Sequence, residues 1–240
     1  MNSAVTLSYY DENAKEFCEN TVNADVAPQR EMFLKYLEDG AYILDFGCGS
    51  GRDTKAFLDL GYRVDAVDGS LELCKTASEY TGIKVKNMLF QDLDEVGKYD
   101  GIWACSSILH VSKEELKIVL KKMLTALKDG GVIYTSFKYG DFEGERNGRY
   151  FSDFTEESFT EFIADFIEES SVDFAEEAFT RCSVDRIDES PAECNADFKK
   201  ESSAESKADC PQIVVAESWI TGDVRPGRGA EKWLNLILKK

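Results

Sequence analysis

Ile-Leu-Asp-Phe-Gly-Cys-Gly-Ser-Gly, residues 43–51, is the stretch that decides the fold of this chain. An apolar run reaches Asp45 and then meets glycines at alternate positions, Gly47, Gly49 and Gly51. Glycine allows a tight strand-to-helix turn and lets a ligand approach the main chain. The helix that follows leaves free N–H groups in its first turn. The stretch therefore predicts a strand, a ligand-binding turn and a helix.

The ligand predicted for this turn carries a positive charge rather than a pyrophosphate. A dinucleotide fingerprint has its third glycine at the position that Arg52 occupies here. A carboxylate such as Asp45 rarely stands just before a loop that must hold a pyrophosphate. S-adenosylmethionine has an ammonium group and no phosphate, so it suits Asp45. A tight turn that binds nothing is the alternative, which the density of glycine and acid disfavours.

Length and composition fit one enzyme-sized globular domain. The 240 residues are 43% hydrophobic, and the formal net charge of -18 disfavours general binding to nucleic acid or anionic membranes. The seven cysteines include no Cys-x-x-Cys pair, so we expect no metal site. The first residues lack a basic leader, and no apolar run is long enough to span a membrane. We expect a soluble, reduced, cytoplasmic protein.

Strands alternate with helices in the first half of the chain. We expect strands at 41–46, 62–68, 83–90, 99–105 and 132–137, and helices at 51–60, 70–80 and 112–128. Ser70 is a predicted N-cap, and Ser112 with Glu115 forms a capping box. Asp129-Gly130-Gly131 is expected to end the last helix. The alternation predicts an α/β fold with a doubly wound, mostly parallel sheet, whose ligands bind beyond the carboxyl ends of the strands.

The flanking segments differ from this core. We expect helix over 10–38 with a break near Pro28, and an amphipathic helix over 152–168. Acidic residues with few large apolar ones fill 169–209, which indicates a mobile insertion. Strands at 213–220 and 233–238 should pair as an antiparallel hairpin on the sheet edge. The predicted parts are residues 1–40, a core of 41–168, the insertion of 169–209 and a hairpin segment of 210–240.

Two acidic residues at strand ends are candidate cofactor ligands. Asp68 closes the second strand 21 residues after Gly47, close to the spacing of about 20 at which a strand-end carboxylate meets a ribose. A solvated loop acid or a helix cap is the alternative for Asp68. Asp92 follows the third strand and could accept from an adenine amino group, with the capping of a short helix as its alternative.

Together these features resemble the class I S-adenosylmethionine-dependent methyltransferases. The matching stretches are 45–51, 68–70, 91–93, 99–102 and 127–131, in the order the family uses. The resemblance implies a Rossmann-like sheet of seven strands, completed by the C-terminal hairpin, and a helical lid formed by residues 1–40. The chain is most similar to bacterial small-molecule methyltransferases of the tellurite-resistance type, in which 169–209 has no recognised counterpart.

The resemblance also implies a set of residues that hold S-adenosylmethionine before transfer and S-adenosylhomocysteine after it. They are Tyr10 in the lid; Asp45, Gly47, Cys48, Gly49 and Gly51 at the methionine moiety; Asp68, Gly69 and Ser70 at the ribose; Gln91, Asp92 and Leu93 at the adenine; and Cys105 facing the methyl donor.

His110, the only histidine in the chain, follows the fourth strand and is the candidate general base. The alternative is that it shapes the pocket, since methyl transfer can proceed by positioning alone. A basic cluster lies after the fifth strand and in the C-terminal hairpin and consists of Lys138, Arg146, Arg149, Arg225 and Arg228. Arg149 and Arg225 are the candidates for clamping a small anion. Their alternative role is to pair with the many surface acids.

The sequence thus predicts methyl transfer to a small-molecule acceptor by direct displacement, and the arginines allow that acceptor to be anionic. We expect no nucleic acid, membrane or metal partner. A non-catalytic module that binds S-adenosylmethionine or a protein partner is the first alternative. An NAD-dependent oxidoreductase is the second, and Arg52 in place of a third glycine counts against it.

Overall fold

The computed structural model describes residues 2–184, 213–225 and 227–240, with side chains from residue 4 to 170 and in the two C-terminal ranges. Of the predicted insertion, residues 185–209 lie outside the described residues. The chain divides into one unit of Met1–Thr160 with Ile213–Lys240 and another of Glu161–Gln212. The first unit holds the sheet and the candidate site.

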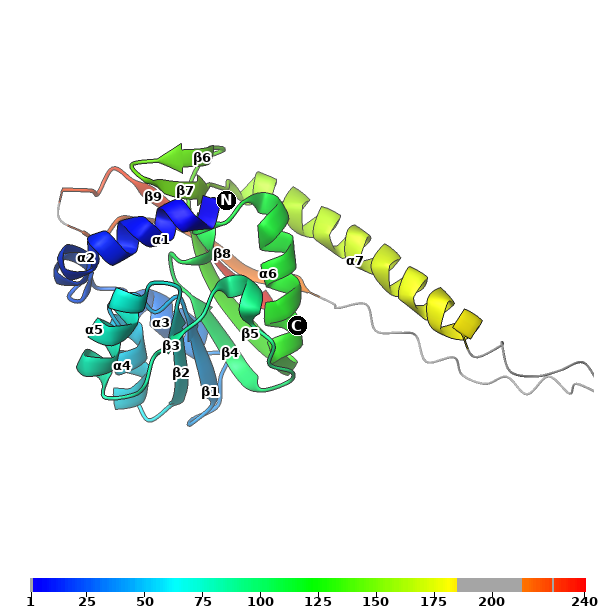
Figure 1. The fold of residues 1–240 in the computed structure, drawn as a ribbon, viewed down its shortest axis with the longest axis horizontal. Coiled ribbons are helices and arrows are strands. Elements are labelled where there is room, and N and C mark those ends of the chain that lie inside the picture. Colours follow the sequence, from blue (N-terminus) through cyan, green and yellow to red (C-terminus); the bar gives the residue numbers. More distant parts are fainter. Residues whose placement is uncertain (1, 185–212, 226) are drawn as a thin grey trace, which may run out of the picture. The chain divides into compact units, whose positions relative to one another are not determined.

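Seven strands form one sheet in the order β3-β2-β1-β4-β5-β9-β8 (Figure 1). Their bounds are Tyr42–Phe46 for β1, Arg63–Asp68 for β2, Lys86–Asn87 for β3, Tyr99–Ala104 for β4, Leu127–Lys138 for β5, Val214–Gly222 for β8 and Lys232–Lys239 for β9. The first five strands run parallel, and β9 is antiparallel to both β5 and β8. This confirms the predicted doubly wound sheet and its C-terminal hairpin.

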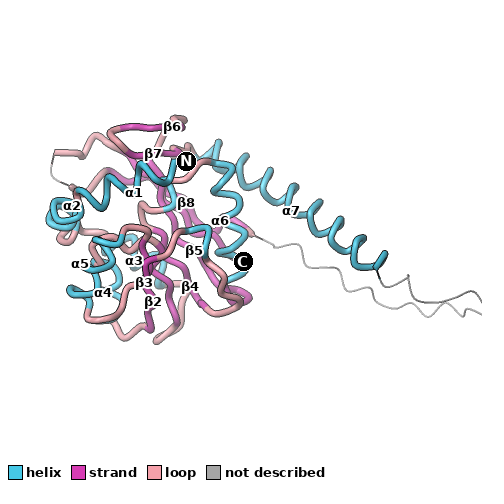
Figure 2. Tube along the Cα trace, in the orientation of Figure 1, coloured by secondary structure: helices cyan, strands magenta, loops and turns pink. Residues whose placement is uncertain are grey.

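The helices occupy both sides of this sheet. Their bounds are Asn2–Glu12 for α1, Ala14–Thr21 for α2, Ala27–Leu34 for α3, Arg52–Asp59 for α4, Leu71–Thr81 for α5, Lys113–Ala126 for α6 and Glu156–Val184 for α7, with short 3-10 helices at Phe90–Asp92 (η1) and Ile108–His110 (η2) (Figure 2). In Figure 1, α4 and α5 lie on one side of the strands and α6 on the other.

Two predicted helix starts are confirmed at atomic detail. The Ser70 hydroxyl accepts the Leu73 N–H at 3.2 Å at the start of α5. Ser112 and Glu115 form the reciprocal capping box that opens α6. Such caps satisfy N–H groups that have no partner within the helix, and each contributes about 1 kcal/mol.

Several boundaries differ from the sequence prediction. The third strand is only Lys86–Asn87, not 83–90. Helix α6 ends at Ala126 rather than at the glycines, because Leu127 is fully buried and pairs with Tyr99 as the first residue of β5. The register then shifts before Val132 pairs with Gly101.

The segments outside the core differ more. Three helices, α1 to α3, replace the single broken helix of 10–38, and Pro28 stands in the first turn of α3, where its missing N–H costs nothing. Helix α7 continues to Val184 instead of ending near 168. A small hairpin of β6 (Glu143–Arg146) and β7 (Arg149–Ser152) was not predicted. Its turn has Asn147 at φ +53 and Gly148 at φ +74, the Asn-Gly signal of a tight hairpin.

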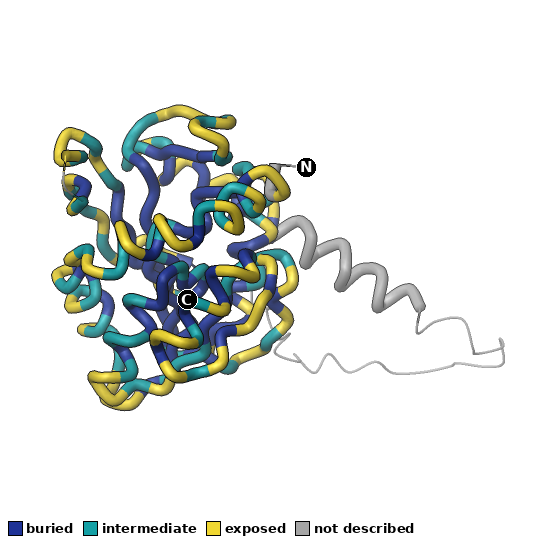
Figure 3. The backbone as a smooth tube through the Cα atoms, turned by 60° about the vertical axis from the view of Figure 1, so that its left-hand side comes forward, coloured by how far each residue is buried: buried dark blue, intermediate teal, exposed yellow. Residues whose placement is uncertain are grey.

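The core of this unit is aromatic and lies where β1, β4 and β5 meet the helices. Trp103 stacks on Tyr134 with ring centroids 4.0 Å apart, and Phe33 and Phe57 pack against Trp103 at 5.3 and 5.5 Å. Buried stretches run through the middle of the unit, and exposed residues gather in its outer turns (Figure 3). The chain visits β2 and β3 on one side of β1 before it crosses to β4, so a ligand crevice is expected at the carboxyl ends of β1 and β4.

Candidate functional site

A cavity of about 210 Å³ opens at that edge of the sheet. The carboxyl ends of β1, β2, β4 and β5 contribute Gly47, Asp68, Cys105 and Lys138 to its wall. Helix α1 closes it with Thr6, Leu7 and Tyr10, and the end of β8 with the turn after it contributes residues 221–225. The cavity thus joins the glycine turn to the basic cluster, two features that are far apart in the sequence.

The glycine turn adopts the conformation that its sequence predicts. Gly47, Gly49 and Gly51 have φ values of +86, +55 and +77, a region that other residues enter only with strain. A Cβ on Gly47 would lie 2.5 Å from the Cβ of Ser107. Position 47 therefore requires glycine for two structural reasons, its positive φ and its close packing on Ser107. Both hold whether or not a ligand approaches the turn.

Asp45 is a buried carboxylate without a cationic partner among the described side chains. It is 2% exposed, lines the cavity and accepts a hydrogen bond of 2.5 Å from the Thr54 hydroxyl. Burial, together with the nearby charge of Asp53, raises the pKa of Asp45 to about 7. A ligand that brings a positive charge to this wall would stabilise the ionised form.

The negative charge of the nearby Asp53 is neutralised by two arginines. Its carboxylate receives Arg30 and Arg52 at 2.6 Å each, and the Trp103 indole N–H at 3.0 Å. Burial alone would raise the pKa of Asp53, but the two guanidinium groups hold it below its ordinary value. Asp45 is therefore the carboxylate of this pair that is left for a ligand.

Asp68 is held rigidly at the end of β2. Its two oxygens accept the N–H groups of Gly49 and Ser70, both at 2.9 Å. Burial raises the pKa of Asp68 to about 6, and these hydrogen bonds offset part of the effect. An ionised carboxylate has about four acceptor positions, and because the main chain of Gly69 also stabilises the charge of Asp68, about one position remains for a donor that enters the cavity.

Most of the predicted site residues, for cofactor, acceptor and catalysis together, line one cavity, and four of the predicted cofactor residues do not. Tyr10, Asp45, Gly47, Cys48, Gly49, Asp68, Gly69, Gln91, Cys105, His110, Arg149 and Arg225 line it. Gly51, Ser70, Asp92 and Leu93 are not among its lining residues.

Those four have other places in the fold. Gly51 is the N-cap of α4, and a Cβ there would lie 2.8 Å from Thr81. The Ser70 hydroxyl is used by the α5 cap and by Asp11 at 2.6 Å. Asp92 is exposed on η1, while Leu93 is 2% exposed outside the cavity. The residues that line this side of the cavity are instead Met88, Leu89, Phe90 and Gln91.

His110 lies in the cavity wall between α1 and β7. Its Nδ1 is 2.6 Å from the main-chain oxygen of Tyr150, and its Nε2 is 2.8 Å from the Tyr10 hydroxyl. Burial lowers the pKa of His110 to about 4, with Arg149 and Arg146 contributing in the same direction. His110 is therefore neutral at physiological pH.

The arginines of the basic cluster separate into two kinds. Arg225 forms a two-pronged ion pair with Asp223 at 2.9 and 2.5 Å, Arg146 pairs with Asp153, and Arg228 pairs with Glu231. The predicted clamp role of Arg225 is weakened because its guanidinium is already used.

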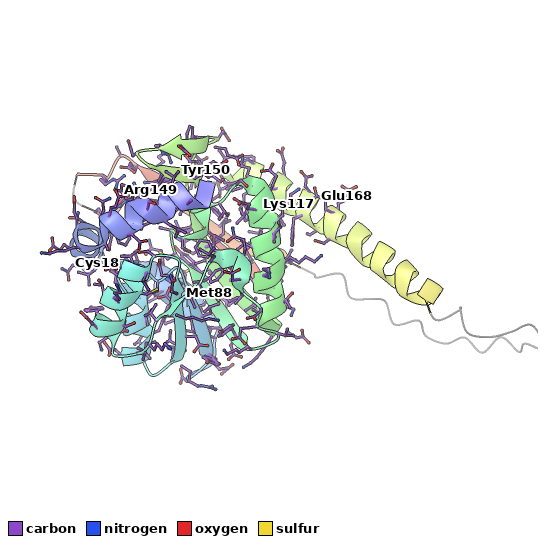
Figure 4. The ribbon with its side chains drawn as sticks, in the orientation of Figure 1. Cys18, Met88, Lys117, Arg149, Tyr150 and Glu168 are labelled. Carbon is purple, nitrogen blue, oxygen red and sulfur yellow. The ribbon has the colours of Figure 1, made fainter. Side chains whose placement is uncertain are left out.

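Arg149 makes no ion pair with any side chain that the structure describes. Its guanidinium lies over the Tyr9 ring at 4.6 Å, and one of its nitrogens is 3.4 Å from the Tyr10 hydroxyl. Its Nε has no hydrogen-bond partner. In Figure 4, Arg149 and Tyr150 lie against α1. Among the arginines of the basic cluster, Arg149 is therefore the one whose charge remains available to a ligand.

Some cavity residues were not predicted from the sequence. Ser106 lines the cavity with φ +53, a strained conformation for serine, and its N–H donates to the Ser136 hydroxyl at 2.9 Å. Phe17 on α2 and Arg52 after the glycine turn also line it. Ser106 belongs to the stretch 105–110 after the fourth strand, which is expected to face the methyl donor, and Arg52 could have been found from its place beside the turn, whereas Phe17 carries no local signal.

Residues 43–131 match the family model described as a methyltransferase domain. An uncharacterised methyltransferase of Staphylococcus carnosus is 29% identical over 120 residues, which cover 46% of this chain and 58% of that protein. The mouse N-terminal Xaa-Pro-Lys N-methyltransferase 1 is 31% identical over 125 residues, covering 46% and 56%. The chain spans 32% to 58% of the length of the curated relatives that match it.

Solved structures share the fold at low sequence identity. The Burkholderia thailandensis 1,6-didemethyltoxoflavin-N1-methyltransferase, with its substrate and S-adenosylhomocysteine bound, has a TM-score of 0.66 at 18% identity and covers 99% of this chain and 88% of its own. The Synechocystis magnesium protoporphyrin IX methyltransferase with bound S-adenosylhomocysteine has a TM-score of 0.62 at 12% identity, and both chains are covered completely.

Among the described residues, no helix is long and apolar enough to cross a membrane. No group of three or more histidine, cysteine, aspartate or glutamate side chains in these ranges could hold a metal ion.

Proposed function

We propose that this chain, a class I S-adenosylmethionine-dependent methyltransferase by its domain and fold, methylates a small-molecule acceptor by direct displacement at the methyl carbon. The observation that carries the proposal is the single cavity in which the glycine turn and Asp68 meet Tyr10, His110 and Arg149. One part of this wall suits the cofactor, and the other suits an acceptor.

The residues of the first part fit S-adenosylmethionine. When bound, the cofactor supplies an electrophilic methyl group on a positively charged sulfur, and it also brings an ammonium group. Asp45 is a buried carboxylate without a cationic partner among the described side chains, and Asp68 keeps acceptor capacity for a ribose hydroxyl. The apolar side chains of Met88, Leu89 and Phe90 offer a surface for the adenine.

The same wall is unfavourable for the NAD alternative. A pyrophosphate near the glycine turn would meet Asp45, whose pKa is already raised by burial and by the charge of Asp53. Adding a doubly negative group there would cost further free energy. The cofactor that relieves this charge is cationic.

The acceptor side favours a small molecule with an anionic group. Arg149 is half-buried, lines the cavity and has no carboxylate partner in the described chain, whereas Arg146, Arg225 and Arg228 all have one. A charge-assisted contact to a guanidinium is about twice as strong as a neutral hydrogen bond. Arg149 would hold the anion, and the three paired arginines would keep the surrounding wall in place.

A screen for turnover tests this proposal. The full chain is incubated with S-adenosylmethionine and a panel of small carboxylic acids that carry an amino or hydroxyl group, alongside their methyl esters as neutral counterparts. Formation of S-adenosylhomocysteine is followed by mass spectrometry. Turnover that depends on an acid and falls at least tenfold with its ester supports the proposal.

Equal turnover of acids and esters would contradict the anionic acceptor but leave methyl transfer standing. Tight binding of S-adenosylhomocysteine with no turnover of any acceptor would favour the non-catalytic binding module. The relatives do not decide the acceptor, because their names include a protein N-terminal methyltransferase and a ubiquinone biosynthesis O-methyltransferase.

A further inference from the structure

The contact between His110 and Tyr10 has a defined direction. The main-chain oxygen of Tyr150 can only accept, so the Nδ1 of His110, 2.6 Å away, carries the ring proton. The Nε2 of the neutral ring is then an acceptor, and the Tyr10 hydroxyl at 2.8 Å must donate to it. Arg149 donates to the Tyr10 oxygen at 3.4 Å, so one lone pair of that oxygen is left for another donor in the cavity.

We propose that Tyr10 accepts a proton from the methyl acceptor while it passes its own proton to His110, so that the accepting atom is an N–H or O–H group. This inference rests on the proposed methyltransferase function. It makes Tyr10 the catalytic residue that touches the acceptor, and it makes His110 a residue that acts through Tyr10.

The transfer balances in atoms and charge. The acceptor's N–H or O–H bond breaks and a new O–H bond forms at Tyr10, while the original Tyr10 O–H bond breaks and an N–H bond forms at the Nε2 of His110. The positive charge that the sulfur loses with its methyl group reappears on the His110 ring. The charged ring keeps two partners, the Tyr150 carbonyl and the Tyr10 oxygen.

The groups around the pair suit this role. Tyr10 faces His110 from α1, Arg146 and Arg149 face it from β6 and β7, and the Phe151 ring lies edge-on at 4.8 Å. Burial lowers the pKa of His110 and keeps its Nε2 free of a proton at neutral pH. Burial raises the pKa of Tyr10, while Arg149, 3.4 Å from its oxygen, lowers it and so stabilises negative charge that develops there during transfer.

The pair exists only when α1 covers the cavity. Tyr10 and His110 are 100 residues apart in the sequence. Their elements are joined by a second contact, in which the Tyr150 N–H donates to the Thr6 hydroxyl at 3.0 Å. Helix α1 therefore both covers the cavity and supplies the Tyr10 side of the relay.

Nitrogen NMR of the full chain with bound S-adenosylhomocysteine tests the arrangement without an acceptor. His110 is the only histidine, so the imidazole signals need no assignment. We expect a neutral ring with the proton on Nδ1 at all pH values from 5.5 to 8. In Tyr10→Phe the Nε2 signal should move toward that of a nitrogen with no hydrogen bond. A proton on Nε2, or titration near the ordinary pKa of 6.5, would overturn the relay.

Kinetics with an N–H or O–H acceptor from the turnover screen give the second test. Tyr10→Phe should lower kcat by about a hundredfold to ten-thousandfold and change the Kd for S-adenosylhomocysteine less than threefold, since the ring itself is kept. Tyr80→Phe, on the exposed face of α5, is the matched control and should behave as the wild type. An unchanged kcat in Tyr10→Phe, or a loss of cofactor affinity as large as the loss of kcat, would overturn the relay. Failure of the wild type to bind S-adenosylhomocysteine would instead overturn the proposed function.

Discussion

Asp45→Asn should make the unliganded protein more stable at alkaline pH. Burial and the charge of Asp53 raise the pKa of Asp45 to about 7, against about 4 in an unfolded chain. The folded state therefore holds this proton more tightly than the unfolded state. The stabilisation is fully present below pH 4 and is lost as the pH rises through 7. A shift of about three units corresponds to about 4 kcal/mol of unfolding free energy at pH 8 and above.

Thermal unfolding between pH 5 and 8.5 measures this effect. Asparagine cannot ionise, and its oxygen can still accept the Thr54 hydroxyl that now lies 2.5 Å from Asp45. Since 1 kcal/mol shifts Tm by about 2–4 °C in a protein of this size, the variant should unfold roughly 10 °C above the wild type at pH 8.5. At pH 5, where the unfolded carboxyl is already ionised, the difference should shrink to about 1.4 kcal/mol, or about 3–6 °C.

A control variant, together with the pH dependence that remains from Asp68, isolates the effect of Asp45. Asp59→Asn changes an exposed carboxylate on α4 and should leave the pH dependence unaltered. Asp68, whose pKa is raised to about 6, should leave part of the alkaline loss in place in the variant. Parallel Tm curves for the wild type and Asp45→Asn would refute the argument that this carboxylate is held at a cost until a cation arrives.

Other substitutions test separate parts of the account. Arg149→Ala should lower kcat/KM for an anionic acceptor tenfold to a hundredfold and leave the cofactor Kd unchanged. The exposed control Arg63→Ala on β2 should change neither kcat/KM nor the cofactor Kd. Arg225→Ala should instead lower the unfolding free energy by about 1–3 kcal/mol, because its partner Asp223 is buried. Denaturant titration measures this loss. A loss of turnover at unchanged stability would show that Arg225 belongs to the acceptor site. Ser112→Ala removes the capping box of α6 and should cost about 1 kcal/mol in the same titration, whereas an unchanged midpoint would show that the cap contributes nothing. Gly47→Ala should lower the unfolding free energy by more than about 1 kcal/mol, since alanine is strained at a φ of +86 and its Cβ would clash with Ser107. An unchanged unfolding free energy would show that the turn relaxes.

The sheet could be predicted because its signals are local. The glycine turn, the strand-end Asp68 and the capping box at Ser112 each specify a boundary within a few residues of sequence. The end of α6 could not be predicted in this way, because the burial of Leu127 and its pairing with Tyr99 outweigh the nearby glycines. The β6–β7 hairpin was missed although Asn147-Gly148 is a clear turn signal, since its strands are only four residues long.

The residues proposed for the cofactor could be placed from the sequence better than those proposed for the acceptor. Asp45 lies near the carboxyl end of β1 and Asp68 is the last residue of β2, and both line the cavity. The state of His110 could not be predicted, because its partners Tyr10 and the Tyr150 carbonyl come from distant segments. The same limit applies to Arg149 and Arg225, which look alike in sequence until the structure pairs one of them with Asp223.

Calorimetric titration of the full chain with S-adenosylhomocysteine and with NAD tests the central claim most directly, with Asp68→Ala as the matched variant. The account predicts binding of S-adenosylhomocysteine at one site, weakened by about 1–3 kcal/mol in Asp68→Ala because the ribose hydroxyls lose their charged acceptor. It predicts much weaker binding of NAD. Binding of NAD at least as tight as that of S-adenosylhomocysteine, or an unchanged affinity in a folded Asp68→Ala variant, would contradict it.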